Sequence, residues 1–144
     1  MLFAAYFFAS YKKNSFSSKA VQIFVPLACM ALFILNPVGG QAWYYSLYWL
    51  IPPIAVLLLP SNLFFRSLGT TFTQHAIGGV IWIYFVNAMT PALWIALIPV
   101  VAVERLVFAS GISVSYLSVN FALQKANDVL VRLNLKPLPL PQKV

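Results

Sequence analysis

The chain has 144 residues, of which 62% are hydrophobic and only 8% are charged, and its mean hydropathy is +0.88. Soluble domains carry about 25% charged residues, and a 16.0 kDa globule leaves much of its chain exposed, so this composition excludes an ordinary soluble domain and predicts an integral membrane protein. The net charge of +7 comes from basic residues in short connections and near the ends, which favours contact with anionic lipid headgroups over binding of nucleic acid.

The first half of the chain contains a short apolar segment and two predicted spans. Residues 1–11 are too few to cross a bilayer, which takes roughly 20 mainly apolar residues, so we expect an interfacial or partly inserted segment that stays on the mature protein. Residues 20–35 form a first span that ends at the turn cluster "NPVGGQ". Residues 42–60 form a second span, whose opening "WYYSLYW" suits a membrane interface.

The second half is predicted to hold two further spans. Residues 61–68, which include Arg66, are a short connection, and residues 69–87 form the third span. The apolar stretch that follows is too long for one crossing, and Pro99 offers a break, because proline removes a backbone donor and clashes with the preceding turn. We therefore expect an interfacial segment over residues 90–98 and a fourth span over residues 100–124.

Lysine and arginine placement sets the expected orientation, since cytoplasmic loops of membrane proteins are enriched in both. The basic residues outside the predicted spans are Lys12, Lys13, Lys19, Arg66, Lys125, Arg132, Lys136 and Lys143. All of them lie inside if both termini and the 61–68 connection are cytoplasmic, and only Arg105 lies elsewhere. The expected fold is thus an all-α, polytopic transmembrane helix bundle of the cell membrane, with about four full spans plus the short N-terminal segment. Residues 1–124 are its transmembrane domain and residues 125–144 a basic, proline-containing cytoplasmic tail.

Prolines interrupt the predicted spans. In an ideal helix Pro52 and Pro53 would leave the carbonyls of Tyr48 and Trp49 without donors, so these groups need other partners. Broken helices at membrane depth occur where they are buried in protein or line a watery cavity. A polar pocket on the outer side of the bundle is one interpretation, and an ordinary proline kink is the other.

The predicted third span carries the chain's single histidine, His75, next to Gln74. Gly78 and Gly79 follow at the helical spacings of three and four residues and leave the surface beside the imidazole empty, so that a ligand or a neighbouring helix can approach. An ionisable residue within a span is a candidate for function, whereas a hydrogen bond between helices is the structural alternative. Trp82 would supply a stacking face to a ligand.

Glu104 and Arg105 stand side by side near the outer end of the predicted fourth span. Adjacent helix residues point about 100° apart, so a bridge between the two cannot be assumed. The row that Glu104 heads is mostly small and should face other helices, whereas Arg105 could extend to the outer headgroups. Either charge could recognise a ligand of opposite charge, or the pair could be a rim charge that fixes the depth of the helix.

Motifs of catalysis and metal binding are missing from the sequence. The two acidic residues, Glu104 and Asp128, fall on opposite sides of the membrane in the expected topology, so no carboxylate pair is available for acid–base chemistry. The single Cys29 and the single histidine lack further ligands at metal-binding spacing. We therefore expect no enzyme activity, no metal and no cofactor.

Three segments, "NPVGGQAW", "HAIGGVIW" and "LIPVVAVERLVFASGISVSY", resemble the substrate-binding (S) components of energy-coupling-factor vitamin transporters. The likeness spans residues 39–123 and lies in glycine- and proline-broken apolar helices. It implies a ligand pocket towards the outside and a transmembrane partner, although family members have more helices than are expected here. Their first helix carries an A-x-x-x-A spacing, which Ala5 and Ala9 reproduce in the short N-terminal segment.

From these patterns we expect a small solute-binding subunit of a membrane transporter with an outward-facing pocket. The candidate ligand-binding residues are Gln74, His75, Trp82, Glu104 and Arg105. Its expected partners are the lipid bilayer, a small-molecule solute and transporter subunits, and not nucleic acid. The alternative is an accessory or scaffold subunit of a larger membrane complex, without a ligand of its own, whose small-residue faces are docking surfaces.

Overall fold

The computed structural model describes residues 16–86 and 88–133, and within these ranges the protein is all-α, as predicted, with no strand. The elements are α2 (Phe16–Leu35), α3 (Pro37–Gln41), the 3₁₀ helix η1 (Trp43–Leu50), α4 (Ile51–Leu58), α5 (Leu63–Phe85) and α6 (Pro91–Arg132). The expected N-terminal segment 1–11, with its A-x-x-x-A spacing, and the proline-rich end of the tail lie outside the described residues.

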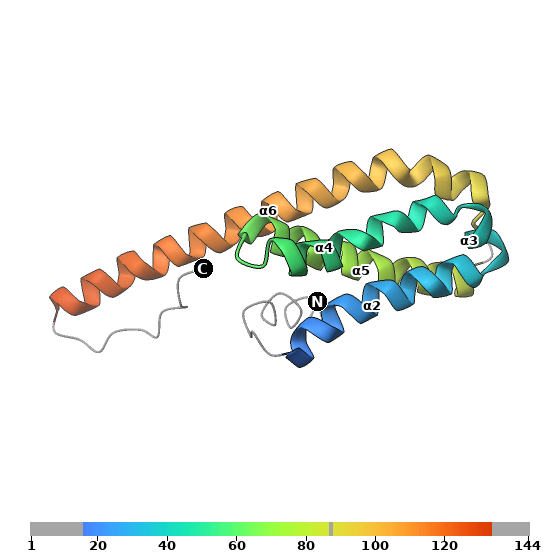
Figure 1. Ribbon diagram of the computed structural model, residues 1–144. Helices are drawn as coiled ribbons and strands as arrows, with labels where there is room; N and C mark the ends of the chain where they lie inside the picture. The colour runs from blue at the N-terminus through green and yellow to red at the C-terminus, as the bar shows by residue number, and fades with distance from the viewer. Residues whose placement is uncertain (1–15, 87, 134–144) are drawn as a thin grey trace.

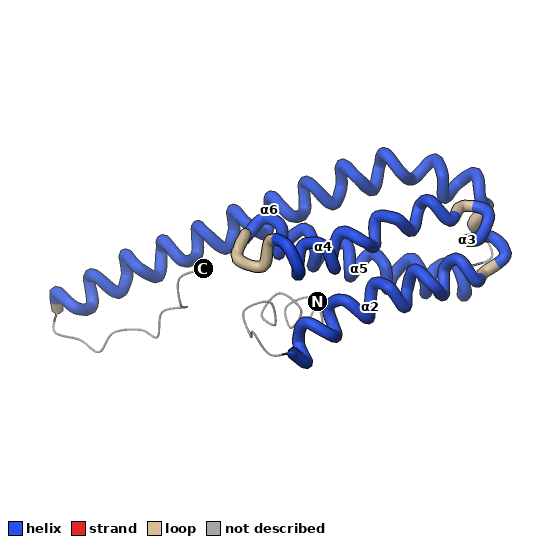
Figure 2. The backbone as a smooth tube through the Cα atoms, viewed as in Figure 1, coloured by secondary structure: helices blue, strands red, loops and turns tan. Residues whose placement is uncertain are grey.

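The helices lie side by side in an elongated bundle (Figure 1). α5 contacts α2, α4 and the first half of α6, and η1 packs on α2. The second half of α6 continues past the end of the bundle, and short loops join the helices at the two bundle ends (Figure 2). This arrangement surrounds α5 with the other elements, so its side chains are the ones that can meet across the bundle.

Side-chain caps start three of the helices. The Oδ1 atom of Asn36 accepts from the backbone N–H two residues on at 2.9 Å, and Pro37 follows at the first helical position, where no N–H is needed. The stretch predicted as a turn cluster is therefore the short helix α3. Asn62 caps α5 and Thr90 caps α6 by the same type of bond.

The proline pair marks the change from 3₁₀ to α geometry. The Ile51 N–H donates to the Tyr48 carbonyl, so the acceptor that Pro52 leaves without its α-helical donor is bonded in the 3₁₀ pattern instead. Pro52 and Pro53 then occupy the first turn of α4, which tolerates the missing N–H groups. The second predicted span is thus two helices in series and not one kinked helix.

α5 begins earlier than predicted. The 61–68 connection is helical from Leu63, because Asn62 caps it, and Arg66 is 5% exposed instead of lying in a loop. The buried threonines that follow form hydrogen bonds within their own helix: the Thr70 and Thr73 hydroxyls donate to carbonyls four residues back, each at 2.8 Å. This internal pairing allows the polar first half of α5 to lie inside the bundle.

α6 is continuous through Pro99, so the predicted break and the separate interfacial segment over residues 90–98 are wrong. A proline leaves the carbonyl four residues back, here that of Ile95, without its α-helical donor, but the helix continues through it. The Tyr48 hydroxyl of η1 bonds to this part of α6 by donating to the Ile98 carbonyl at 3.1 Å. The same helix runs on beyond residue 124 to Arg132.

α6 is also the one described helix that is long and apolar enough to cross a membrane. The apolar helices Lys19–Leu35 and Trp43–Leu58 are shorter, and the 23 residues of α5 include polar and basic side chains. Of the four predicted spans, only the fourth therefore falls in a helix that meets the length and hydropathy expected of a span. Most of its apolar side chains are exposed, unlike those of the core helix of a soluble protein.

An aromatic cluster joins three elements at the end of the bundle that carries α3. Phe33 of α2 makes edge-on contacts with Trp49 of η1 and Trp94 of α6, at centroid distances of 5.2 and 5.0 Å. Tyr45 of η1 packs on Trp94 at 4.9 Å. Gly39 of α3 fits closely here, since a Cβ on it would overlap the Phe33 carbonyl oxygen. The cluster fixes η1 relative to α6 and so forms one wall of the site described next.

Candidate functional site

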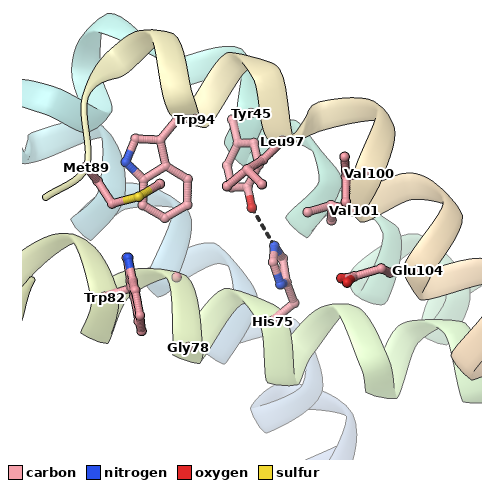
Figure 3. Close-up of a pocket in the computed structure, with 11 residues that line it drawn as sticks. Tyr45, His75, Gly78, Trp82, Met89, Trp94, Leu97, Val100, Val101 and Glu104 are labelled. Carbon is pink, nitrogen blue, oxygen red and sulfur yellow. Dashed lines mark hydrogen bonds between the residues drawn. The ribbon is translucent and has the colours of Figure 1, made fainter.

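A cavity of about 390 Å³ lies between η1, α5 and α6 (Figure 3). Its walls are mostly aromatic and aliphatic, with a small number of polar groups. The lining residues are Tyr45, His75, Gly78, Gly79, Trp82, Met89, Trp94, Leu97, Val100, Val101 and Glu104. This combination of apolar walls and few polar groups is typical of small-molecule sites, which measure about 300–1,000 Å³.

The imidazole of His75 is held by a residue that sequence reasoning missed. The Tyr45 hydroxyl and the His75 Nε2 atom are hydrogen-bonded at 2.6 Å, and the two rings are in contact (Figure 3). Tyr45 is fully buried, whereas His75 is partly accessible from the cavity. The bond therefore fixes the orientation of the imidazole while leaving one of its sides open to a ligand.

The two glycines that follow His75 have different neighbours. A Cβ on Gly79 would meet the Trp49 ring at 3.0 Å, so this glycine allows α5 to pack against η1. A Cβ on Gly78 would have no heavy atom within 4 Å, and this position opens on the cavity. From the sequence, either a ligand or a neighbouring helix could lie against this surface. In the structure, η1 packs against Gly79, whereas Gly78 adjoins empty space.

Glu104 and Arg105 form an ion pair, which helical spacing alone did not predict. The Arg105 Nη2 atom donates to the Glu104 Oε2 atom at 3.1 Å, because the long arginine side chain bends towards its neighbour. The Glu104 side chain is 50% exposed and lines the cavity, whereas the Arg105 side chain is 16% exposed and its guanidinium lies 4.8 Å from the centre of the Phe108 ring. The Glu104 carboxylate thus lines the cavity (Figure 3), whereas Arg105 is not among the lining residues.

The packing of α6 is the reverse of the predicted one. The row headed by Glu104 was expected to face other helices, but its members are exposed: Phe108, Gly111, Ser115, Ser118 and Ala122. The buried face instead carries Val101 and Ala109 and includes Arg105. The prediction assumed that small residues face a neighbouring helix. In the structure, the contact of Trp94 with Phe33 at the start of α6 determines which face of the helix points inward.

Of the two remaining predicted residues, Trp82 lines the cavity and Gln74 does not. Trp82 lines the cavity at its rim and is 51% exposed. Gln74 is exposed and does not line the cavity, although it is adjacent to His75, because successive helix residues point in different directions. The structure therefore brings together His75, Trp82 and Glu104 around one cavity, and Arg105 adjoins it through its ion pair with Glu104.

Several lining residues were not found from the sequence. Tyr45 belongs to the aromatic run that we attributed to the membrane interface, and no pattern distinguishes it from its exposed neighbour Tyr44. Trp94 and Met89 surround a helix start that we predicted to be interfacial. Their contribution depends on the crossing of η1 and α6, which residue spacing within one helix does not encode.

The cavity carries few polar groups. They are one carboxylate, one tyrosine–histidine pair and the Trp94 indole N–H, which has no hydrogen-bond partner although Trp94 is only 2% exposed. Within the described residues, no three His, Cys, Asp or Glu side chains come together as they would to hold a metal ion. The chain matches no protein-family model, and neither a curated protein nor a solved structure shows significant similarity to it.

Proposed function

We propose that the protein is a multi-pass protein of the cell membrane, in which α2, η1–α4, α5 and α6 cross the bilayer together. The distribution of side chains supports this proposal. Bulky apolar side chains are exposed on each of these helices, for example Phe24, Leu58 and Phe85, whereas Gln22 and Thr73 are buried. A soluble protein rarely exposes large contiguous apolar surface, and it usually places glutamine and threonine outside. Lipid as the solvent accounts for both features.

Helix lengths agree with this proposal even where composition is ambiguous. At 1.5 Å per residue, the 20 residues of α2 extend about 30 Å and the 23 residues of α5 about 35 Å. η1 and α4 have 8 residues each, and because a 3₁₀ helix rises about 2.0 Å per residue, together they reach about 28 Å. These lengths are close to the ~30 Å hydrocarbon core, so each element is long enough to cross.

The positions of the basic residues support an orientation with both termini in the cytoplasm. Lys19 and Arg66 lie in the first turns of α2 and α5, and Lys125 and Arg132 lie in the part of α6 beyond the same bundle end. The positive-inside rule makes this end cytoplasmic. The cavity lies towards the opposite end, so it would open to the outside.

In this orientation the protein functions as a solute-binding subunit of a membrane transporter. The observation that carries the proposal is the cavity, in which aromatic walls adjoin the Tyr45–His75 pair and the Glu104 carboxylate. The cavity is open to the surroundings, and its volume of about 390 Å³ is within the range of small-molecule sites. As in the S components that the sequence resembles, partner subunits would couple the bound solute to transport.

Detergent-free extraction in native lipid, followed by mass spectrometry of bound small molecules, tests this function. Wild-type protein should carry a solute in a fixed ratio to protein. Gly78→Leu should lose it, because the new side chain projects into the cavity beside His75, whereas Gly111→Leu adds the same side chain to an exposed position of α6 and should retain it. Equal loading of both variants, or a wild type without any solute, would refute the proposal.

A second candidate is an accessory or scaffold subunit, favoured by the second half of α6. The Ser113 hydroxyl bonds to Ser67 at 3.1 Å near the start of α5, and residues 114–132 then continue for about 28 Å past the bundle. Exposed apolar side chains along this stretch include Leu117 and Phe121. A scaffold predicts that truncation of α6 after residue 113 abolishes co-purification of partner proteins, while Gly78→Leu leaves it unchanged.

A further inference from the structure

One charged residue lines the cavity, and its ion-pair partner Arg105 adjoins it. Glu104 is the single charged residue among the described lining residues, and its carboxylate points towards the His75 side of the cavity (Figure 3). Arg105 bonds to the Oε2 atom only, which leaves the second carboxylate oxygen without a hydrogen bond among the described residues. Because Glu104 lines the cavity and is the more exposed partner of the ion pair, whereas Arg105 is 16% exposed and does not line it, an entering solute contacts the negative partner.

Aromatic rings line the rest of the cavity. Tyr45 and Trp94 form one wall from η1 and α6, and Trp82 faces them from α5 (Figure 3). The faces of aromatic rings carry partial negative charge and attract cations, most strongly when water is excluded. Aromatic walls and a carboxylate in one cavity both favour a positive group, and neither offers an anion a favourable contact.

The far end of the cavity offers hydrogen-bond donors. The indole nitrogens of Trp82 and Trp94 both lie on the Met89 side (Figure 3). The Trp94 N–H is buried without a partner, whereas the Trp82 side chain is 51% exposed, so its N–H can donate to an acceptor atom on a bound solute. The cavity therefore has a hydrogen-bond acceptor, the Glu104 carboxylate, at one end and an indole N–H donor at the other.

We propose that this cavity binds a small organic cation, such as an amine, a quaternary ammonium or a cationic heterocycle. Its positive group lies against Glu104, and an acceptor atom at its other end bonds to the Trp82 N–H. The inference rests on the proposed solute-binding function and specifies its substrate class. Neutral and anionic solutes of the same size lack the contact with Glu104 and bind less tightly.

The test uses three probes of similar size in lipid nanodiscs: the cation benzyltrimethylammonium, neutral benzamide and anionic benzoate. Binding is followed by tryptophan fluorescence, since Trp82 and Trp94 line the cavity. The cation should bind most tightly. Glu104→Gln should weaken its binding by about 10- to 100-fold, the range expected for loss of a hydrogen bond to a charged group, and should change benzamide binding little. Arg105→Gln should strengthen cation binding, because it removes the competing positive charge.

Each outcome distinguishes this inference from the function on which it rests. If benzamide or benzoate binds as tightly as the cation, or if Glu104→Gln leaves cation binding unchanged, the proposed substrate class is wrong. The solute-binding function would still stand in that case if Gly78→Leu abolished binding of the probes. If the three probes do not bind to wild type, the inference is overturned. Thermal unfolding of each variant, with Gly111→Ala as a control at an open position, separates loss of binding from loss of folding.

Discussion

The adjacent glycines Gly78 and Gly79 give a matched pair of substitutions with opposite expected effects. Both lie in the middle of α5, so replacement by leucine changes helix propensity equally, by about 0.8–1 kcal/mol in favour of the variant. What differs is the space beyond the Cβ. At Gly78 no heavy atom lies within 4 Å, whereas at Gly79 the Trp49 ring lies at 3.0 and 3.4 Å.

The Trp49 ring has little freedom to move away from a new side chain. It is fully buried and makes an edge-on contact with Phe33 at 5.2 Å. Overpacking of a filled core costs about 1–3 kcal/mol, and leucine adds three carbons beyond a Cβ that is already too close, so we expect the upper end of this range. Gly79→Leu should therefore be less stable than Gly78→Leu by about 3 kcal/mol, because propensity cancels between the two.

The free energy of unfolding of both variants can be measured by titration with a denaturing detergent and followed by far-ultraviolet circular dichroism. Gly78→Leu should unfold at or above the wild-type midpoint, and Gly79→Leu well below it. Equal midpoints would mean that α5 does not pack on η1 through Gly79, and a strongly destabilised Gly78→Leu would mean that the cavity is not there.

Three further predictions concern the site and its setting. The bond between Tyr45 and His75 should give a coupling energy of about 1 kcal/mol in a double-mutant cycle with Tyr45→Phe and His75→Leu, measured by the same titration, and additive effects would contradict it. Tyr48→Phe removes the hydroxyl that bonds α6 beside its proline and should cost about 0.5–1.5 kcal/mol, whereas Tyr44→Phe at an exposed position should stay within about 0.5 kcal/mol of wild type. In a variant without the native cysteine, Gln41→Cys should react with a membrane-impermeant maleimide added outside intact cells, and a cysteine in the basic tail should not; the reverse labelling would contradict the proposed orientation.

The positions of the helices were largely predictable from the sequence, because apolar runs, caps and turn residues are local signals. Residues 20–35, 42–60 and 69–87 each overlap the helices observed there. The errors occur where packing overrides a local preference. Pro99 lies within α6, where the Tyr48 hydroxyl of η1 bonds to the adjacent carbonyl, and Arg66 is buried because α5 starts at a cap before it. Neither effect can be read from the residues of one segment.

Part of the candidate site could be predicted from the sequence. His75, Trp82 and Glu104 stand out as rare polar or amphipathic side chains in apolar helices, and they face one cavity. Tyr45 and Trp94 do not stand out, because aromatic residues are common in this chain and only the crossing of η1 with α6 selects these two. Gln74 was selected for its proximity to His75 in the sequence, which is a poor guide to direction on a helix.

A high-resolution structure of the protein in lipid nanodiscs, prepared without detergent, tests the central claim most directly. A solute-binding site predicts discrete density of small-molecule size within the cavity, in contact with Glu104 and between the rings of Trp82 and Trp94. Density for a lipid chain that enters past Trp82, or a cavity closed by approach of α6 to α5, would contradict the account.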